Sequence, residues 1–247
     1  MIIAAVQTIP KENIEKNLVD HYRLINLAAE YGVNLMLFPE LSISGYEREL
    51  AESLEFIPND PRLDELRNLS AQKNIIIIAG APVRLVSQLF IGAFIFHPDG
   101  GEKIYTKQYL HDGEEIFFTP GENDSLQIIV ENETFSVAIC ADITNPAHAL
   151  KAASLNSTIY LASIFYTPNG ISEGYKNLQG YATAFSMNVL MSNFGGPSYG
   201  FESAGKSGFW NNKGDLIESF EGTGEGLLLV RKTEKSWEAE IVKSSDL

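Results

Sequence analysis

The sequence predicts an α/β protein. Its opening reads as a strand, a helix and a second strand, which is typical of the α/β class. Residues 34–38 are apolar on both faces, as a strand needs when helices cover its sheet. Predicted strands and helices alternate along most of the 247 residues, with no linker or change of composition. We therefore expect one domain over residues 1–247, a length that can bury a sizeable core.

In the first half, periodicity and turn residues define each element. Residues 2–7 are an apolar run and predict the first strand. Apolar side chains then recur at helical spacing from Glu12, and the helix is expected to end at Gly32. Pro39 ends the strand of residues 34–38. The further predicted elements are a helix over 61–72, a strand over 74–78, and strands over 88–97 and 103–107 around the turn at 98–101.

The second half continues with short strands and two helices. Strands are predicted over 125–130, 134–139, 157–163, 189–193, 207–210, 215–219, 226–230 and 237–242. Helices are predicted over 146–155 and 171–187. Asn145 or Thr144 as a cap and Pro146 in the first turn mark the start of the first of these helices.

Composition excludes several kinds of partner. The net charge of −14 argues against nucleic acid or an anionic membrane, since both need a basic surface. No window approaches the ~20 apolar residues of a membrane span, and residues 1–7 lack a secretory leader. The single cysteine fits a reducing compartment, so we expect a cytoplasmic protein. The histidines show no metal-ligand spacing, and we expect no metal.

That single cysteine, Cys140, closes the predicted strand 134–139 and precedes a predicted helix. Backbone N–H groups at a helix start favour a thiolate and can lower the pKa of a thiol below its usual ~8.5. A buried, inert cysteine is the ordinary alternative for one residue at this position.

Two other reactive groups also lie at strand ends. Glu40 directly follows the strand of residues 34–38, and Lys107 lies where the strand 103–107 gives way to a loop. A thiol is a nucleophile, a carboxylate can accept its proton, and an ammonium can stabilise an oxyanion. Burial beside a cysteine would raise the pKa of Glu40 and make it a better base near neutral pH.

The sequence segments around Glu40, Lys107 and Cys140 occur in an order that can be compared with known families. They are Leu37-Phe38-Pro39-Glu40 with Ser44-Gly45-Tyr46, Tyr105-x-Lys107 with Pro120-Gly121, Ile139-Cys140-x-Asp142, Asn193 with Gly195, and Gly205-Lys206-Ser207 before the hairpin at Gly214. Together they resemble the nitrilase superfamily of carbon–nitrogen hydrolases over nearly the whole chain.

This resemblance implies a four-layer α-β-β-α sandwich. It also implies that Cys140 attacks an amide or nitrile carbon, that Glu40 is the general base and that Lys107 supports the tetrahedral intermediate. The family has a second glutamate in the loop before Pro-Gly. Glu114 fits this position best, and Glu115 is the competitor. The backbone N–H of Ala141 would join Lys107 in the oxyanion hole, and no cofactor is needed.

The substrate is less defined by the resemblance. Relatives that act on nitriles typically have Trp-Glu after the cysteine, whereas this chain has Ala141-Asp142. This departure favours a small amide or carbamoyl compound and leaves nitrile hydrolysis as the alternative. Tyr46, Phe165 and Tyr166 are candidate pocket residues, with the segment around Phe194. Relatives commonly pair, so a homodimer or larger homo-oligomer is expected.

Two rival interpretations remain. Cys140 and His148 could form a papain-like pair, but His148 lies about two turns along the following helix, where its ring would point away. The chain could also be a non-catalytic binding protein on the same fold, because fold does not fix function. The complete Glu–Lys–Cys set argues against this second rival.

Overall fold

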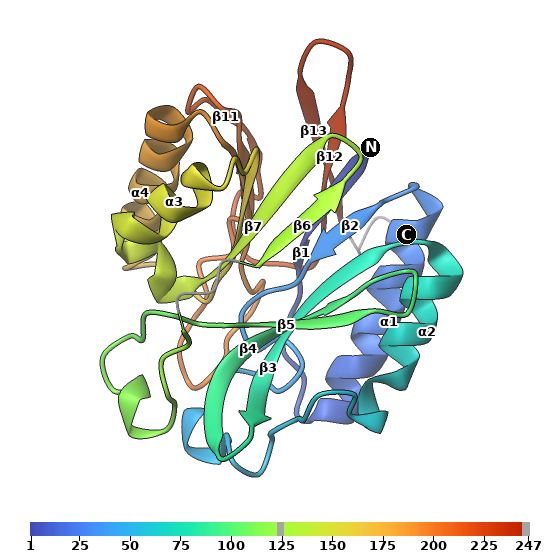
Figure 1. Cartoon of the computed structure of the whole chain (residues 1–247), viewed down its shortest axis with the longest axis vertical. Coiled ribbons are helices and arrows are strands. Elements are labelled where there is room, and N and C mark those ends of the chain that lie inside the picture. Colours follow the sequence, from blue (N-terminus) through green and yellow to red (C-terminus); the bar gives the residue numbers. More distant parts are fainter. Residues whose placement is uncertain (123–125, 244–247) are drawn as a thin grey trace.

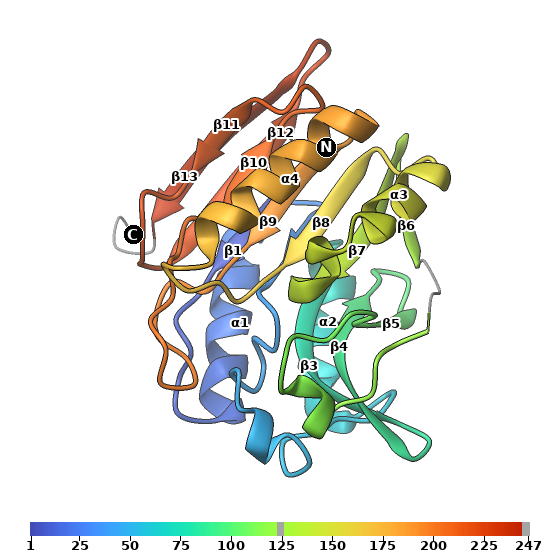
Figure 2. The same cartoon turned by 90° about the vertical axis from the view of Figure 1, so that its left-hand side faces the viewer.

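Two β-sheets lie face to face between two pairs of helices (Figure 1). A computed structural model describes residues 1–122 and 126–243. Helices α1 (Ile14–Glu30) and α2 (Asp64–Lys73) cover one sheet, and α3 (Pro146–Ser154) and α4 (Ile171–Phe185) cover the other. Figure 2, turned by 90°, shows α3 and α4 together in front of the second sheet. The predicted α/β class and the α-β-β-α layering are confirmed.

The first sheet has seven strands in the order β13-β12-β1-β2-β3-β4-β5, and β1, β2 and β3 are parallel. Its strands are β1 (Ile2–Gln7), β2 (Leu35–Leu37), β3 (Ile76–Leu85), β4 (Gln88–Phe96), β5 (Glu102–Thr106), β12 (Gly226–Lys232) and β13 (Trp237–Lys243).

The second sheet has six strands in the order β11-β10-β9-β8-β7-β6, and β7, β8 and β9 are parallel. Its strands are β6 (Gln127–Val130), β7 (Glu133–Ile139), β8 (Ile159–Ser163), β9 (Asn188–Ser192), β10 (Gly208–Trp210) and β11 (Leu216–Ser219). Ser125, where the strand before β7 was expected to begin, lies outside the described residues.

Alternation along the strands divides the core into two parts. In β1, Ile3 and Ala5 face the second sheet, whereas Ala4 and Val6 pack with the helices α1 and α2. This is the period-2 pattern of a strand buried on both faces. The sheets are also joined by polar contacts: the Ser192 hydroxyl donates to the carbonyl oxygen of Val6 at 2.6 Å. The site described below lies where the two sheets meet.

Two predicted elements need correction. The strand expected over 74–78 is the longer β3, because antiparallel pairing with β4 continues to Leu85 across its small residues. The helix expected over 61–72 begins as a 3-10 turn, η2 (Pro61–Leu63), before α2. In contrast, the Asn145 cap before α3 is confirmed, since its side chain accepts the N–H of Ala147 at 3.0 Å.

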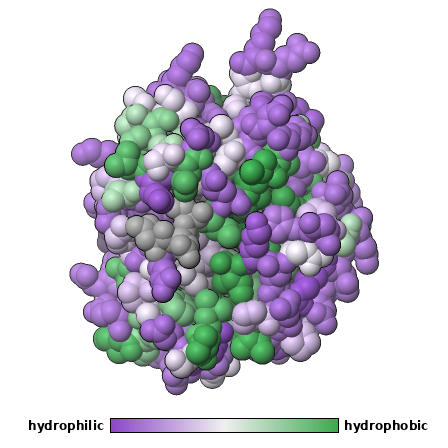
Figure 3. Space-filling model, in the orientation of Figure 1, coloured by the Kyte–Doolittle hydropathy of each residue, from purple (hydrophilic) through white to green (hydrophobic). Residues whose placement is uncertain are grey.

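The surface visible in Figure 3 is mostly hydrophilic. On the face shown in Figure 3, hydrophilic residues surround separate groups of hydrophobic ones. No helix within residues 1–122 and 126–243 combines the length and the hydropathy needed to traverse a bilayer. In the same ranges, no group of three or more His, Cys, Asp or Glu side chains is placed to hold a metal.

Candidate active site

Glu40, Lys107, Glu114 and Cys140 converge between the sheets. Glu40 follows β2 and Lys107 follows β5, both in the first sheet, whereas Cys140 follows β7 in the second. The side chains of Glu40, Lys107 and Glu114 are fully buried, and Cys140 is 7% exposed. Residues far apart in the sequence therefore meet in one enclosed space.

A close approach of backbone segments positions Glu40. The turn that carries it lies against β3, where the N–H of Ile43 donates to the carbonyl oxygen of Gly80 at 2.9 Å. A Cβ atom at Gly80 would come within 2.4 Å of the backbone nitrogen of Leu41. The small residue in β3 thus allows the Glu40 turn to rest directly on the strand.

Lys107 is held by both of its backbone groups. Its N–H donates to the carbonyl oxygen of Ile91 at 2.9 Å, which extends the pairing with β4. Its carbonyl oxygen accepts the N–H of Gly121 at 2.7 Å. A Cβ atom at Gly121 would lie 2.4 Å from the Thr106 hydroxyl, so only glycine fits there. This contact gives the Pro-Gly pair of the sequence a physical role.

Cys140 occupies a strained bend. It is the first residue of the 3-10 turn η4 (Cys140–Thr144). Its φ of +41° lies in the left-handed region, where any residue other than glycine is strained. The thiol lies 3.8 Å from the carbonyl oxygen of Phe165. The bend sets the thiol at the junction of strand and helix, as the sequence predicted.

Asp142 ties the two halves of the site together. Its Oδ1 accepts the backbone N–H groups of the two residues after Lys107, each at 2.9 Å. Its Oδ2 accepts the N–H of Ile139, just before Cys140, at 2.9 Å and the Tyr105 hydroxyl at 2.7 Å. One buried carboxylate therefore fixes the Lys107 loop relative to the Cys140 bend. The sequence placed Asp142 in a motif but gave no sign of these partners.

Lys107 is the centre of an ionic cluster. Its Nζ lies 2.7 Å from Glu40 Oε1, and 2.9 Å and 2.8 Å from the two carboxylate oxygens of Glu114. Glu114 also accepts the Tyr46 hydroxyl at 2.5 Å and the N–H of His111 at 2.8 Å. The structure thus places Glu114, and not the exposed Glu115, beside the lysine.

Burial and charge shift the ionisation of these groups. Burial raises the pKa of Glu40 to about 7; the charge of Lys107 opposes this shift and that of Glu114 adds to it. Burial alone would lower the pKa of Lys107, but the neighbouring carboxylates of Glu40 and Glu114 raise it above its ordinary value. The ammonium is therefore permanently charged.

The thiol behaves differently from the sequence expectation. Burial, followed by the charge of Glu40, raises the pKa of Cys140 well above its ordinary value, and Lys107 opposes this only in part. The expected lowering by a helix start is wrong, because η4 is one short turn and desolvation is the larger effect. The resting thiol is protonated.

The candidate pocket residues surround this cluster unequally. The rings of Tyr46 and Phe165 pack 5.1 Å apart, and Phe165 also packs on Phe194 at 5.6 Å. The Tyr166 ring lies against α4, since a Cβ at Gly174 would come within 2.3 Å of it. Tyr46 and Phe165 thus adjoin the cluster directly, whereas the ring of Tyr166 is turned toward the helix.

His148 is occupied elsewhere. Its Nδ1 lies 2.7 Å from the Tyr160 hydroxyl, and its Nε2 lies 2.8 Å from the Tyr105 hydroxyl. Burial lowers the pKa of His148. With both ring nitrogens engaged by tyrosines, a papain-like pairing with Cys140 has no geometric support.

Known proteins share this sequence pattern and fold. Residues 2–235 match the family model described as carbon-nitrogen hydrolase. An N-carbamoylputrescine amidase of Solanum lycopersicum is 25% identical over 68% of this chain and 58% of its own length. A probable nitrilase of Schizosaccharomyces pombe is 30% identical over 62% of this chain and 61% of its own length. The chain thus covers less than two thirds of these curated relatives.

Among solved structures, a serine mutant of the Nesterenkonia AN1 amidase from the nitrilase superfamily has a TM-score of 0.85 at 24% identity, covering 94% of this chain and 92% of that chain. This similarity shows that the two proteins share a fold. The family match covers nearly the whole chain and shows that the chain belongs to the carbon–nitrogen hydrolase family.

Proposed function

We propose that the protein is a thiol hydrolase that cleaves the C–N bond of a small amide or carbamoyl compound. This proposal rests on the different surroundings of the two carboxylate oxygens of Glu40. Its Oε1 is held by Lys107 at 2.7 Å, whereas its Oε2 is buried without a well-aligned hydrogen-bond donor among the described residues. The Cys140 thiol is close enough to oppose, by hydrogen bonding, the rise that burial causes in the pKa of the carboxyl group. A buried acceptor without a well-formed hydrogen bond lowers the stability of the folded protein, and such an atom often has a catalytic role. Here Oε2 is available to accept the thiol proton.

In the first half-reaction, Cys140 Sγ forms a bond to the carbonyl carbon while its proton passes to Glu40. The carbonyl oxygen becomes an oxyanion, stabilised by the Lys107 ammonium and the N–H of Ala141. Collapse of this intermediate breaks the C–N bond. The proton on Glu40 passes to the departing nitrogen, which leaves as ammonia or an amine.

In the second half-reaction, water gives a proton to Glu40 and attacks the thioester carbon. The C–S bond breaks and the proton returns to Cys140. The sum is addition of one water across the C–N bond, and the protein is regenerated. Because the resting thiol is protonated, its proton transfer to Glu40 accompanies the attack, which suits a base with a pKa near neutrality.

The acid limb of the pH profile tests Glu40. As its pKa is about 7, the base is protonated at lower pH. We therefore expect kcat/KM to fall about tenfold per pH unit well below pH 7. Initial rates of ammonia release between pH 5 and 9 in constant-ionic-strength buffers measure this limb. A limb centred near pH 4 to 5 would assign the base to another group.

Glu114 and Glu115 form a matched pair of adjacent glutamates. Glu114→Gln weakens the contacts with Lys107, and we expect kcat to fall by about 10- to 100-fold. Glu115 is exposed and accepts only the N–H of Gly113, at 2.7 Å, among its described contacts. Glu115→Gln should therefore leave kcat within about twofold. Equal effects in the two variants would contradict the proposed role of Glu114.

A substrate screen tests the function itself. Simple amides, ω-amido acids, N-carbamoyl amines and nitriles are offered to the protein, and ammonia release is measured. Intact-protein mass spectrometry of quenched reactions should show the acyl adduct, and peptide mapping after digestion should place it on the peptide that contains Cys140. Turnover of nitriles without amides would favour the nitrilase alternative. No turnover and no adduct in any class would favour a non-catalytic binding protein.

The remaining expectations belong to the same proposal. One hydrolase domain over residues 1–247 agrees with the family match over 2–235, and a cytoplasmic location agrees with the single cysteine. A homodimer or larger homo-oligomer is proposed from the family resemblance alone. The candidate contacts of Tyr46, Ala141, Phe165 and Tyr166 with substrate are likewise proposed.

A further inference from the structure

Arg48 differs from four of the other five arginines. These four pair with carboxylates: Arg23 with Asp20, Arg62 with Asp60, Arg67 with Glu102 and Arg84 with Glu55. Arg48 has no carboxylate within ion-pair distance among the described residues, and its Nε is buried without a hydrogen-bond partner. The carboxylate of the adjacent Glu49 binds the Tyr199 hydroxyl and acts on Arg48 only through its charge. Burial alone would lower the pKa of the guanidinium, and the charge of Glu49 is among the effects that raise it instead.

The guanidinium is held by aromatic rings and not by strong hydrogen bonds. Its Cζ lies 5.8 Å from the centre of the Tyr46 ring and 4.9 Å from that of Tyr199. Its two described hydrogen bonds, to the Asp112 carbonyl and the Tyr199 hydroxyl, are both 3.5 Å long, the outer limit for such a bond. The planar donor group is therefore oriented but largely unused.

Arg48 lies one side chain away from the ionic cluster. Tyr46, on whose ring it rests, donates to Glu114, which binds Lys107. Arg48 also lies against the loop that carries Glu114, since a Cβ at Gly113 would come within 3.3 Å of its Nη1. The residue thus borders the loops that supply Tyr46 and Glu114 to the site.

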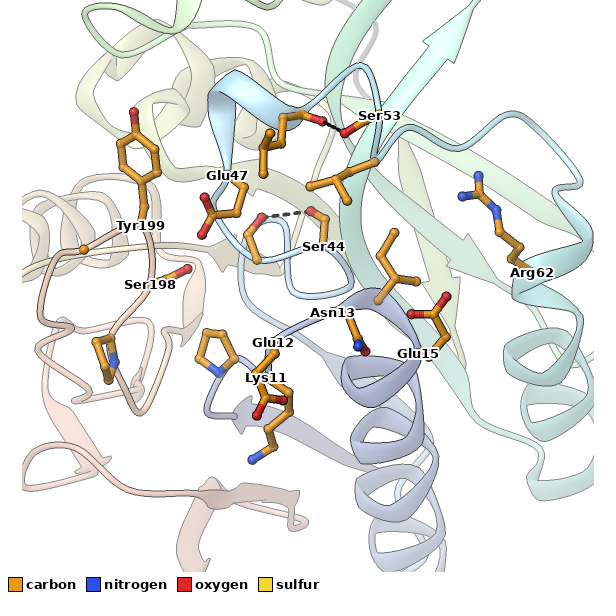
Figure 4. Close-up of a pocket in the computed structure, with 17 residues that line it drawn as sticks. Lys11, Glu12, Asn13, Glu15, Ser44, Glu47, Ser53, Arg62, Ser198 and Tyr199 are labelled. Atoms are coloured by element: carbon orange, nitrogen blue, oxygen red, sulfur yellow. Dashed lines mark hydrogen bonds between the residues drawn. The ribbon is translucent and has the colours of Figure 1, made fainter.

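A groove of about 850 Å³ opens beside Tyr199. Figure 4 shows Glu47, Ser198 and Tyr199 around it, contributed by the loop after β2 and the loop after β9. Tyr199 lines the groove, and its ring packs on Tyr46 at 5.8 Å. Arg48 and Tyr46 do not line the groove themselves, and Tyr199 is the lining residue that contacts both of them.

We propose that Arg48 binds a carboxylate at the end of the substrate remote from the scissile bond. This inference rests on the proposed function and narrows its substrate class. The substrate is then an amide or N-carbamoyl compound that ends in a carboxylate. A guanidinium fork matches the two oxygens of a carboxylate. A substrate that ends in an ammonium group would be repelled by the same charge.

The test compares substrates of equal length that differ only in their remote group. Monoamides of dicarboxylic acids with two to five methylenes are paired with unsubstituted primary amides and with ω-amino amides. N-carbamoyl amino acids form a second carboxylate arm, which separates a carboxylate on the acyl side from one on the leaving group. The variants are Arg48→Met, Arg48→Lys and the control Arg231→Met, which removes the same charge from an exposed position on β12.

In the unaltered protein, we expect one chain length of the carboxylate series to be preferred over its neutral and cationic counterparts. Arg48→Met should raise KM for that substrate by about 10- to 100-fold, the range of a charge-assisted hydrogen bond. Arg48→Lys should recover part of this loss. KM and kcat for the neutral amides should change by less than about threefold in each variant, and Arg231→Met should match the unaltered protein throughout.

Two outcomes would overturn the inference. Equal losses on neutral and carboxylate substrates in Arg48→Met would show that Arg48 only packs the loops together. A preference for neutral or cationic substrates in the unaltered protein would exclude a carboxylate subsite. Both leave the proposed hydrolysis intact, whereas absence of turnover in every arm would refute the hydrolase itself.

Discussion

Cys140→Ala should abolish ammonia release, with a loss of about 10⁴-fold or more relative to the unaltered protein. The reason is that the thioester route needs a nucleophile, and Glu40, Lys107 and Glu114 offer none in its place. The substitution removes one sulfur atom from a site 7% exposed, so the fold should survive it. Steady-state ammonia assays, together with circular dichroism and thermal unfolding, measure both effects.

Substrate binding separates a chemical defect from a structural one. The alanine variant should still bind the best amide of the screen, as a rise of its melting temperature with substrate concentration, because bound ligand stabilises the native state. Cys140→Ser keeps a nucleophilic atom and should retain traces of activity at most, since a hydroxyl is far harder to deprotonate. Activity within tenfold of the unaltered protein in Cys140→Ala would remove the thiol from the mechanism.

Lys107→Met should lose both activity and stability. Without the ammonium, the oxyanion loses its main support, and we expect kcat to fall by about 10³-fold. The carboxyl groups of Glu40 and Glu114 also remain buried without their cation, which costs about 3–5 kcal/mol of unfolding free energy. Urea unfolding followed by fluorescence, alongside the ammonia assay, measures the two losses.

The loss of unfolding free energy in Lys107→Met should increase with pH. Of the two carboxyl groups left without their cation, Glu40 has a pKa of about 7 and takes up a proton at pH 5, so the loss of stability should be larger at pH 8 than at pH 5. Lys103→Met is the matched control, because Lys103 lies on the same strand, β5, with an exposed side chain. A stable Lys107→Met variant at pH 8 would show that the buried ion cluster contributes little.

Much of this architecture could be predicted because local signals and tertiary packing agree. The helices α1 and α4 and most strands follow from apolar periodicity, and Asn145 with Pro146 marks the start of α3. The strand β3 was predicted too short, since its extension past Ile78 depends on pairing with β4 and not on its own residues. Small residues that lack strand propensity can be drawn into a sheet by a long-range partner.

The site could be predicted in its reactive groups but not in their surroundings. Glu40, Lys107 and Cys140 lie at strand ends, where a sequence pattern can mark them. The choice between Glu114 and Glu115 depended on which side of a 3-10 turn faces Lys107, a property of the folded loop. Arg48 carried no signal at all, because its lack of a carboxylate partner is visible only when all of its neighbours are known.

The division of the site between two sheets has a consequence for how the molecule matures. The base and the lysine belong to a sheet that also contains β12 and β13, and these strands follow every strand of the nucleophile's sheet in sequence. As β12 pairs with β1, that sheet is complete only after the last strands of the chain have docked beside the first. Closure of the sheet that carries Glu40 and Lys107 therefore depends on contacts between residues far apart in the sequence, and such contacts form more slowly during folding than local ones.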